Sequence, residues 1–193
     1  MLTVTCLGPA WADAGVICPW ALYQAYGDRQ VLEEHYASMK RFVDYLESSS
    51  IGLVRSHPEY QGWRGYGDWL ALDGSGKTDG GTPKDLIGTA FFAYSTRLLA
   101  RIAETLGNEQ DTAHYERLFE RVRQVFQARF VTAEGLIVGQ TQSCYVLALA
   151  FDLLPAHLRP VAVAELVRDI QQRGTHLSTG FVSTNFLPFV LSD

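Results

Sequence analysis

The segment Thr82-Pro-Lys-Asp-Leu-Ile-Gly-Thr-Ala-Phe-Phe-Ala-Tyr94 decides the fold of this 193-residue chain. Thr82 is a candidate N-cap, Pro83 suits the first helical position, and Asp85 would complete an acidic capping box. The helix predicted from here to about Leu106 has almost no charge in its first half. A helix that is apolar on all sides must be surrounded by other helices, so we expect this one inside a helical domain.

Apolar and amphipathic helices are predicted to alternate along the chain. The apolar helices span about 13–26, 82–106, 141–154 and 182–191. The amphipathic helices span about 29–48, 108 or 111 to 130, and 159–173. An α/α toroid requires this alternation, because its inner helices are enclosed and its outer helices face solvent. We therefore predict an all-α chain that forms part of an (α/α)6 toroid, with about seven of the twelve helices of a closed six-hairpin ring.

The predicted connections differ in length in a regular way. Links from an inner helix to the following outer helix are short, whereas the links 48–81, 131–140 and 174–180 lead from an outer helix to the next inner one and are long. In an antiparallel arrangement, the long loops gather over the N-termini of the inner helices. Long structured loops collected at one end are where a binding site is expected.

Aromatic, acidic and amide side chains occupy these loops. They are Trp11, Asp13, Trp63, Tyr66, Asp68, Trp69, Asp73, Gln140, Thr141, Gln142, His176, Thr179 and Asn185. Aromatic faces pack against C–H groups, and carboxylates bind hydroxyls or move protons, so this set suits a sugar or polyol.

Simpler roles remain open for the individual side chains. Asp13 and Asp85 are also suited to capping a helix, because a carboxylate is favoured by the free N–H groups of the first turn. Asp68 is equally suited to fixing its own loop, and His176 to a purely structural role. Trp63 is a candidate lid residue.

Charge and hydropathy narrow the function classes. The formal net charge is −5 and no basic run occurs, which argues against a nucleic-acid partner. The longest apolar run, 143–154, is too short to span a membrane and contains Asp152. The N-terminus lacks the basic region of a signal peptide, which favours a cytoplasmic location.

No metal or cofactor site is expected. Cys6, Cys18 and Cys144 have no metal-ligand spacing, and we expect them to be buried thiols that act as small hydrophobes. The histidines show no ligand spacing with one another, and the chain has no glycine-rich phosphate loop.

Several segments, in order along nearly the whole chain, together carry a resemblance. They are 11–28, 36–46, Gly67-Asp-Trp-Leu70, 82–94, Thr141-Gln142, 175–184 and Leu191-Ser-Asp193. With these segments the chain resembles the catalytic domain of bacterial α-L-rhamnosidases, which are inverting glycoside hydrolases with an (α/α)6 barrel. The resemblance implies that Trp11, Asp13, Trp69 and His176 line a rhamnose subsite, and that Asp68 orients or hydrogen-bonds. The implied partner is a rhamnose-containing glycoside or polysaccharide.

The resemblance also implies two catalytic glutamates that this sequence does not contain. In that family the general acid lies in an Asp-Glu-Arg…Gly-Trp-Thr-Gly-Asp stretch and the general base in a Trp-Glu stretch, and neither motif occurs here. We expect residues 1–193 to be the middle of one such domain, without its N- and C-terminal portions, and to be inactive alone. Asp13 and Asp68 are the fallback acid and base.

Three further expectations concern the chain as a whole. Another α/α-toroid glycosidase, of the glucoamylase or trehalase kind, is the second candidate enzyme. A carbohydrate-binding or helical interaction module without turnover is the candidate from a different class. The inner helices of an open ring leave apolar flanks uncovered, so we expect self-association through them.

Overall fold

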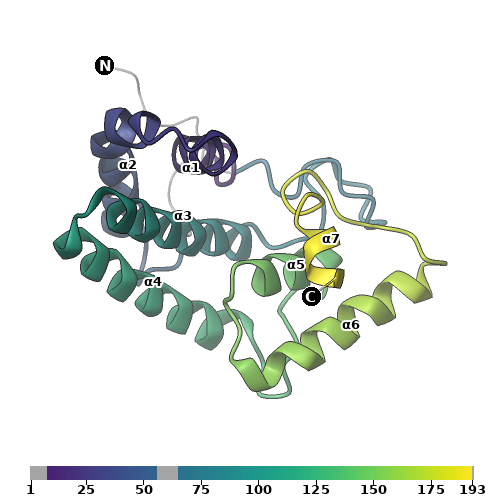
Figure 1. Cartoon of the computed structure of the whole chain (residues 1–193). Helices are drawn as coiled ribbons and strands as arrows, with labels where there is room; N and C mark the ends of the chain where they lie inside the picture. The colour runs from purple at the N-terminus through teal and green to yellow at the C-terminus, as the bar shows by residue number, and fades with distance from the viewer. Residues whose placement is uncertain (1–7, 56–64, 193) are drawn as a thin grey trace.

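The computed structural model of this chain describes residues 8–55 and 65–192 (Figure 1). The described residues form seven α-helices, one short 3-10 helix and, in place of strands, two isolated β-bridges. The elements are α1 (Ala14–Tyr26), α2 (Gln30–Ser49), α3 (Lys84–Leu106), α4 (Glu109–Phe130), α5 (Gln142–Ala150), η2 (Ala156–Leu158), α6 (Arg159–Gln172) and α7 (Leu187–Ser192). None of these helices is long and apolar enough to cross a bilayer.

The helices pack as successive hairpins. Helix α1 pairs with α2, α3 with α4, and α5 with α6. The first helices of the hairpins also contact one another in chain order, α1 with α3, α3 with α5, and α5 with α7. In Figure 1, α2, α4 and α6 lie along the periphery of an arc, and the other helices lie within it. The predicted part of an α/α toroid, with alternating inner and outer helices, is therefore confirmed.

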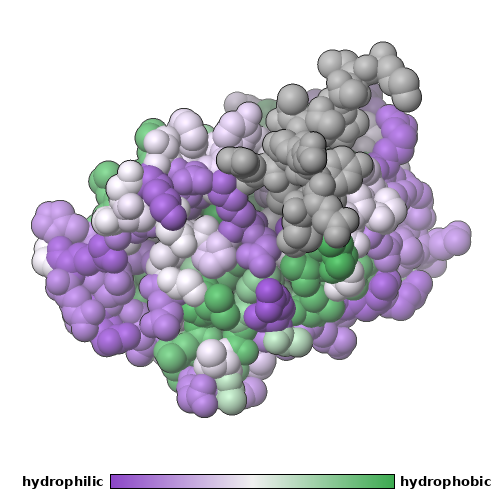
Figure 2. Space-filling view, turned by 180° about the vertical axis from the view of Figure 1, so that it is seen from behind, coloured by the Kyte–Doolittle hydropathy of each residue, from purple (hydrophilic) through white to green (hydrophobic). Residues whose placement is uncertain are grey.

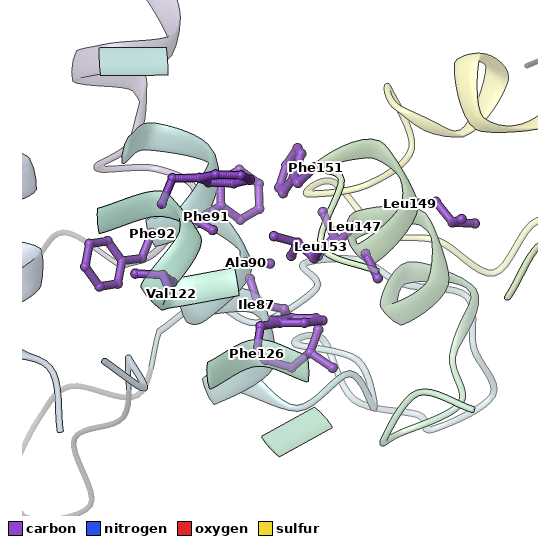
Figure 3. Close-up of a cluster of buried hydrophobic side chains, with 14 of the residues drawn as sticks. Ile87, Ala90, Phe91, Phe92, Val122, Phe126, Leu147, Leu149, Phe151 and Leu153 are labelled. Carbon is purple, nitrogen blue, oxygen red and sulfur yellow. The ribbon is translucent and has the colours of Figure 1, made fainter. Parts of the chain in front are cut away.

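The core lies between the inner helices α3 and α5 and the outer helix α4. Figure 3 shows Phe91 of α3 near Phe151, which follows α5, and Phe126 of α4 near Ile87 of α3. The rings of Tyr94 and Phe151 stack in parallel with centroids 4.1 Å apart. Each fully buried side chain of this size contributes about 1.5–3 kcal/mol, so the packing of α3 holds the arc together.

The start of α3 differs from the prediction. The helix begins at Lys84 with Pro83 in the N-cap position and without a capping side chain. The hydroxyl of Thr82 instead shares a hydrogen bond of 2.7 Å with the hydroxyl of Thr141, at the N-terminus of α5. The side chain of Asp85 accepts from the adjacent N–H of Leu86. The predicted capping box was therefore wrong, and Thr82 joins two inner helices instead.

The N-terminus of α4 was predicted with two possible starting residues. The structure selects Asn108, whose side chain accepts a hydrogen bond of 3.1 Å from the N–H of Asp111. One orphan donor of the first turn is thereby satisfied, as expected for an asparagine N-cap.

The two terminal inner helices, α1 and α7, are only partly enclosed. Helix α1 buries Val16 and Pro19, whereas its apolar residues Leu22 and Tyr26 are exposed. Helix α7 starts at Leu187 rather than near 182 because the preceding residues form turns. Figure 2 shows that apolar side chains also reach the surface in patches on the back face. Helix α5 is buried on nearly all sides, whereas α1 and α7 leave apolar flanks uncovered, as predicted for the inner helices of an open ring.

The two described cysteines differ in burial. Cys144 in α5 is buried, as predicted, and burial raises its pKa to about 11. Cys18 in α1 is exposed, so its predicted burial was wrong. Cys6 lies outside the described residues.

Candidate functional site

Two of the long loops meet over the N-terminus of α5. The backbone N–H of Phe181, in the loop between α6 and α7, donates to the carbonyl of Trp69 at 2.8 Å. The neighbouring N–H of Gly180 donates to the side chain of Asp68 at 3.0 Å. The predicted gathering of loops at one end is thus seen directly for the loops that contain these residues.

Four aromatic rings from three segments form one cluster, which we call the aromatic wall: Trp11, Tyr66, Trp69 and Phe181. Trp11 lies 4.9 Å from Tyr66 and 5.6 Å from Phe181, whose ring is tilted by 24° from its own. Tyr66 meets Trp69 edge-on at 6.1 Å. Trp69 is 37 % exposed and Phe181 70 % exposed, so the wall offers apolar ring surface to a ligand.

Asp68 lies directly beneath the wall and is 1 % exposed. One carboxyl oxygen, Oδ2, accepts from the hydroxyl of Ser143 and from the N–H of Gly180. The other oxygen, Oδ1, is buried and accepts no hydrogen bond of good geometry from the described residues. The hydroxyl of Ser183 donates to Ser143 at 2.7 Å, which extends the buried network. Burial raises the pKa of Asp68, although hydrogen bonding from Ser143 and from the backbone of Gly180 and Val182 acts against that rise.

Asp13 lies at the N-terminus of α1 and is 2 % exposed. Its Oδ1 accepts from the hydroxyl of Ser95 in α3 at 2.5 Å, and its Oδ2 accepts from the N–H of Ala10 at 2.9 Å. It caps no amide of α1. Both oxygens are therefore used to fix the segment that carries Trp11, and burial raises the pKa of Asp13.

His176 is exposed and lies outside the aromatic wall. Its Nδ1–H donates to the carbonyl of Arg173 at 2.8 Å, and its own carbonyl accepts from Gln142 at 3.2 Å. Gln142 is fully buried, and its Oε1 accepts from the N–H of Ser178 at 2.9 Å. This glutamine holds the loop that carries His176 against the N-terminus of α5.

A shallow surface depression lined by Pro9, Gly65, Gly67, Lys84 and Ile87 encloses no cavity volume. Within residues 8–55 and 65–192, no three His, Cys, Asp or Glu side chains are grouped as metal ligands. The candidate lid residue Trp63 lies outside the described residues.

Sequence reasoning brought Trp11, Tyr66 and Trp69 together correctly as neighbours but missed Phe181, Gly180 and the two buried serines. A signal for them existed. The stretch Thr179-Gly-Phe-Val-Ser183 places a large apolar residue and a glycine in an otherwise polar loop. Such an arrangement is typical of a loop that packs closely against other backbone.

The hairpins of inner and outer helices, with an aromatic wall over the N-termini of the inner ones, define the class of α/α-toroid proteins. Comparison with known proteins specifies the family. The chain belongs to the family described as the bacterial alpha-L-rhamnosidase 6 hairpin glycosidase domain, which matches residues 3–193.

Named relatives agree with this assignment. The chain is 48 % identical over 183 residues to an alpha-L-rhamnosidase of Streptomyces avermitilis, covering 95 % of this chain and 16 % of that protein. It is 38 % identical over 189 residues to an alpha-L-rhamnosidase of Alteromonas sp., covering 95 % of this chain and 20 % of the relative.

Solved structures share the fold. The crystal structure of Streptomyces avermitilis alpha-L-rhamnosidase complexed with L-rhamnose has a TM-score of 0.87 at 47 % identity, covering 96 % of this chain and 17 % of that one. The native enzyme from Aspergillus terreus has a TM-score of 0.85 at 32 % identity, covering 95 % and 21 %. The chain thus spans about one fifth or less of the length of these relatives.

Proposed function

We propose that this chain is the middle part of the catalytic domain of an inverting glycoside hydrolase that removes terminal α-L-rhamnosyl residues. In this proposal the chain supplies one side of the rhamnose subsite. The observation that carries it is the aromatic wall, which lies in a chain 48 % identical to an alpha-L-rhamnosidase.

The proposed roles follow from exposure and hydrogen bonding. Trp69 stacks on the apolar face of the sugar because its ring is exposed, and the half-buried ring of Trp11 adds to the same wall. Asp13 supports Trp11 through its bonds to Ala10 and Ser95. His176 remains a predicted contact to the sugar hydroxyls, since its ring is exposed and bonds the carbonyl of Arg173 through Nδ1.

The chemistry requires two carboxyl groups about 6.5–9.5 Å apart, one to protonate the leaving oxygen and one to activate water. We assign both to residues outside this sequence, because the family's acid and base motifs are absent from it. The 193-residue chain alone is therefore expected to hydrolyse no rhamnoside. Asp13 and Asp68 would become the acid and base only if the isolated chain proved active.

A chimera tests this proposal. The matching segment of the Streptomyces enzyme is replaced by this chain, and hydrolysis of an aryl α-L-rhamnoside is measured beside hydrolysis of the aryl α-glucoside. We expect rhamnosidase activity in the chimera and none in the isolated chain.

Two results would contradict the proposal. A folded chimera that cleaves the glucoside in preference would favour another α/α-toroid glycosidase. Turnover of the rhamnoside by the isolated chain would instead make Asp13 and Asp68 the acid and base, and their conversion to asparagine would then abolish it.

We further infer that the chain associates through its terminal inner helices when nothing else covers them. Leu22 and Tyr26 of α1 are exposed, and so are Phe189 and Leu191 of α7. Exposed apolar area of a few hundred Å² forfeits on the order of 10 kcal/mol, which is comparable to the stability of a domain.

A further inference from the structure

Asp68 joins three segments that are far apart in the sequence. Its own loop carries Trp69, its Oδ2 accepts from Ser143 in the first turn of α5, and the same oxygen accepts from Gly180 next to Phe181. The carbonyl of Trp69 in turn accepts from the N–H of Phe181 at 2.8 Å. Two rings of the aromatic wall are therefore held together by contacts that centre on one buried carboxyl group.

Gly180 packs tightly against Asp68 and Trp69. A Cβ at Gly180 would lie 2.5 Å from both the carbonyl oxygen and the Oδ1 of Asp68, and 2.6 Å from the carbonyl oxygen of Trp69. Ser143 and Ser183 are also buried, so the loops meet through direct contacts. A side chain at position 180 would therefore push the Phe181 loop away from the Asp68–Trp69 backbone.

The hydrogen bonding favours an uncharged acid. Oδ1 accepts no hydrogen bond of good geometry from the described residues, and a carboxylate with an incompletely satisfied buried oxygen is costly, although the backbone of Val182 offsets part of that cost. Burial raises the pKa of Asp68, which acts in the same direction. A neutral amide has the same shape as a neutral acid, and its oxygen accepts the same two hydrogen bonds.

We propose that Asp68 is a positioning residue that sets the spacing of the aromatic wall, and that it acts through shape and hydrogen bonding as an uncharged group. It does not touch the sugar itself. The expected effect of Asp68 on rhamnoside binding rests on the proposed function. Its effect on the packing of the aromatic wall does not, because that packing needs no ligand.

The test uses Asp68→Ala, Asp68→Asn and Ser143→Ala in the full chain, with Glu116→Gln as the control. Glu116 is an exposed carboxylate on the outer helix α4, far from the wall in sequence. Near-UV circular dichroism reports the packing of the tryptophans, and the same variants in the Streptomyces chimera report KM and kcat for an aryl α-L-rhamnoside.

We expect Asp68→Ala to weaken the near-UV signal and raise KM about tenfold with a smaller change in kcat, as lost uniform binding does. Asp68→Asn should restore both to near the unsubstituted protein, and Glu116→Gln should change neither. If Asp68→Ala does not fold, Ser143→Ala should show the same pattern more weakly.

Two outcomes would overturn the inference. One is an Asp68→Asn variant as impaired as Asp68→Ala, which would show that the negative charge matters. The other is an Asp68→Ala variant that folds with an unchanged near-UV signal and KM. An inactive chimera combined with the expected near-UV changes would refute the proposed function and leave the positioning role supported.

Discussion

Gly180 is packed so closely against the Asp68–Trp69 backbone that no side chain fits there. Gly180→Ala is expected to destabilise the chain by about 3 kcal/mol, because the atoms that the methyl group meets are largely backbone and cannot move aside cheaply. Gly15→Ala is the matched control, since its Cβ would meet nothing within 4 Å in α1. That variant should be neutral or more stable by about 0.5–1 kcal/mol.

Urea unfolding of both glycine variants gives the comparison, with the slope of each transition checked for a common denatured state. A Gly180→Ala variant as stable as Gly15→Ala would mean that the two loops do not meet as closely as the structure has them.

Asp13 gives a pH dependence of definite sign. Burial raises the pKa of this carboxyl above its ordinary value, so at a pH between the two values the folded chain holds a proton that the unfolded chain has released. Its contribution to stability is therefore full below about pH 4 and lost as the pH rises through the raised pKa. The free energy of unfolding of the unsubstituted chain, minus that of Asp13→Asn, should fall with rising pH.

The comparison with Asp13→Asn is needed because other carboxyl groups change the free energy of unfolding with pH in the opposite direction. Hydrogen bonds and neighbouring cations lower the pKa of Asp73, Asp79 and Asp111, and these groups are common to both proteins. Denaturant unfolding at a series of pH values measures the difference. A difference that increases with pH would show that Asp13 is ionised in the folded chain.

At the scale of elements, the sequence predicted a helix cap correctly where the capping hydrogen bond is local. The Asn108 cap depends on an N–H three residues away, and the sequence was sufficient to propose it. The Thr82 cap failed because its hydroxyl pairs with Thr141, 59 residues further along the chain. Competition from a distant partner leaves no trace in the local pattern, so position within the fold overrode capping preference.

Part of the candidate site was also predictable from the sequence and part was not. Trp11, Tyr66 and Trp69 were expected together because the predicted helix order brings their loops to one end, and their rings do form one cluster. The partners of the two aspartates were not predictable in this way. Asp13 accepts from Ser95, 82 residues away, and serines inside apolar helices look alike whether they bind a carboxyl or not.

At the scale of the whole molecule, position along the arc decides how much of an apolar helix is covered. Helix α5 contacts inner neighbours on both sides, α3 and α7, and nearly all of its residues are buried. Helix α1 has one inner neighbour, α3, and buries two residues. The two helices have similarly apolar sequences, so the difference in burial comes from the number of neighbours and not from composition.

The open ends of the arc lead to a prediction of association. Burying the apolar side chains of Leu22 and Tyr26 is worth about 1.5–3 kcal/mol for each large side chain, so the isolated chain should gain mass as its concentration rises. Sedimentation velocity from low to high micromolar concentration measures this. The double variant Leu22→Ser/Tyr26→Ser should remain closer to the monomer mass.

Exposed apolar residues elsewhere provide the control that makes this result specific. Leu72 and Val138 are also exposed but lie in loops outside the terminal helices. If association depends on the ends of the arc, Leu72→Ser/Val138→Ser should associate like the unsubstituted chain. Equal loss of association in both double variants would point to unspecific apolar contacts, and a chain that stays monomeric throughout would show that the exposed flanks are too small to bind a second copy.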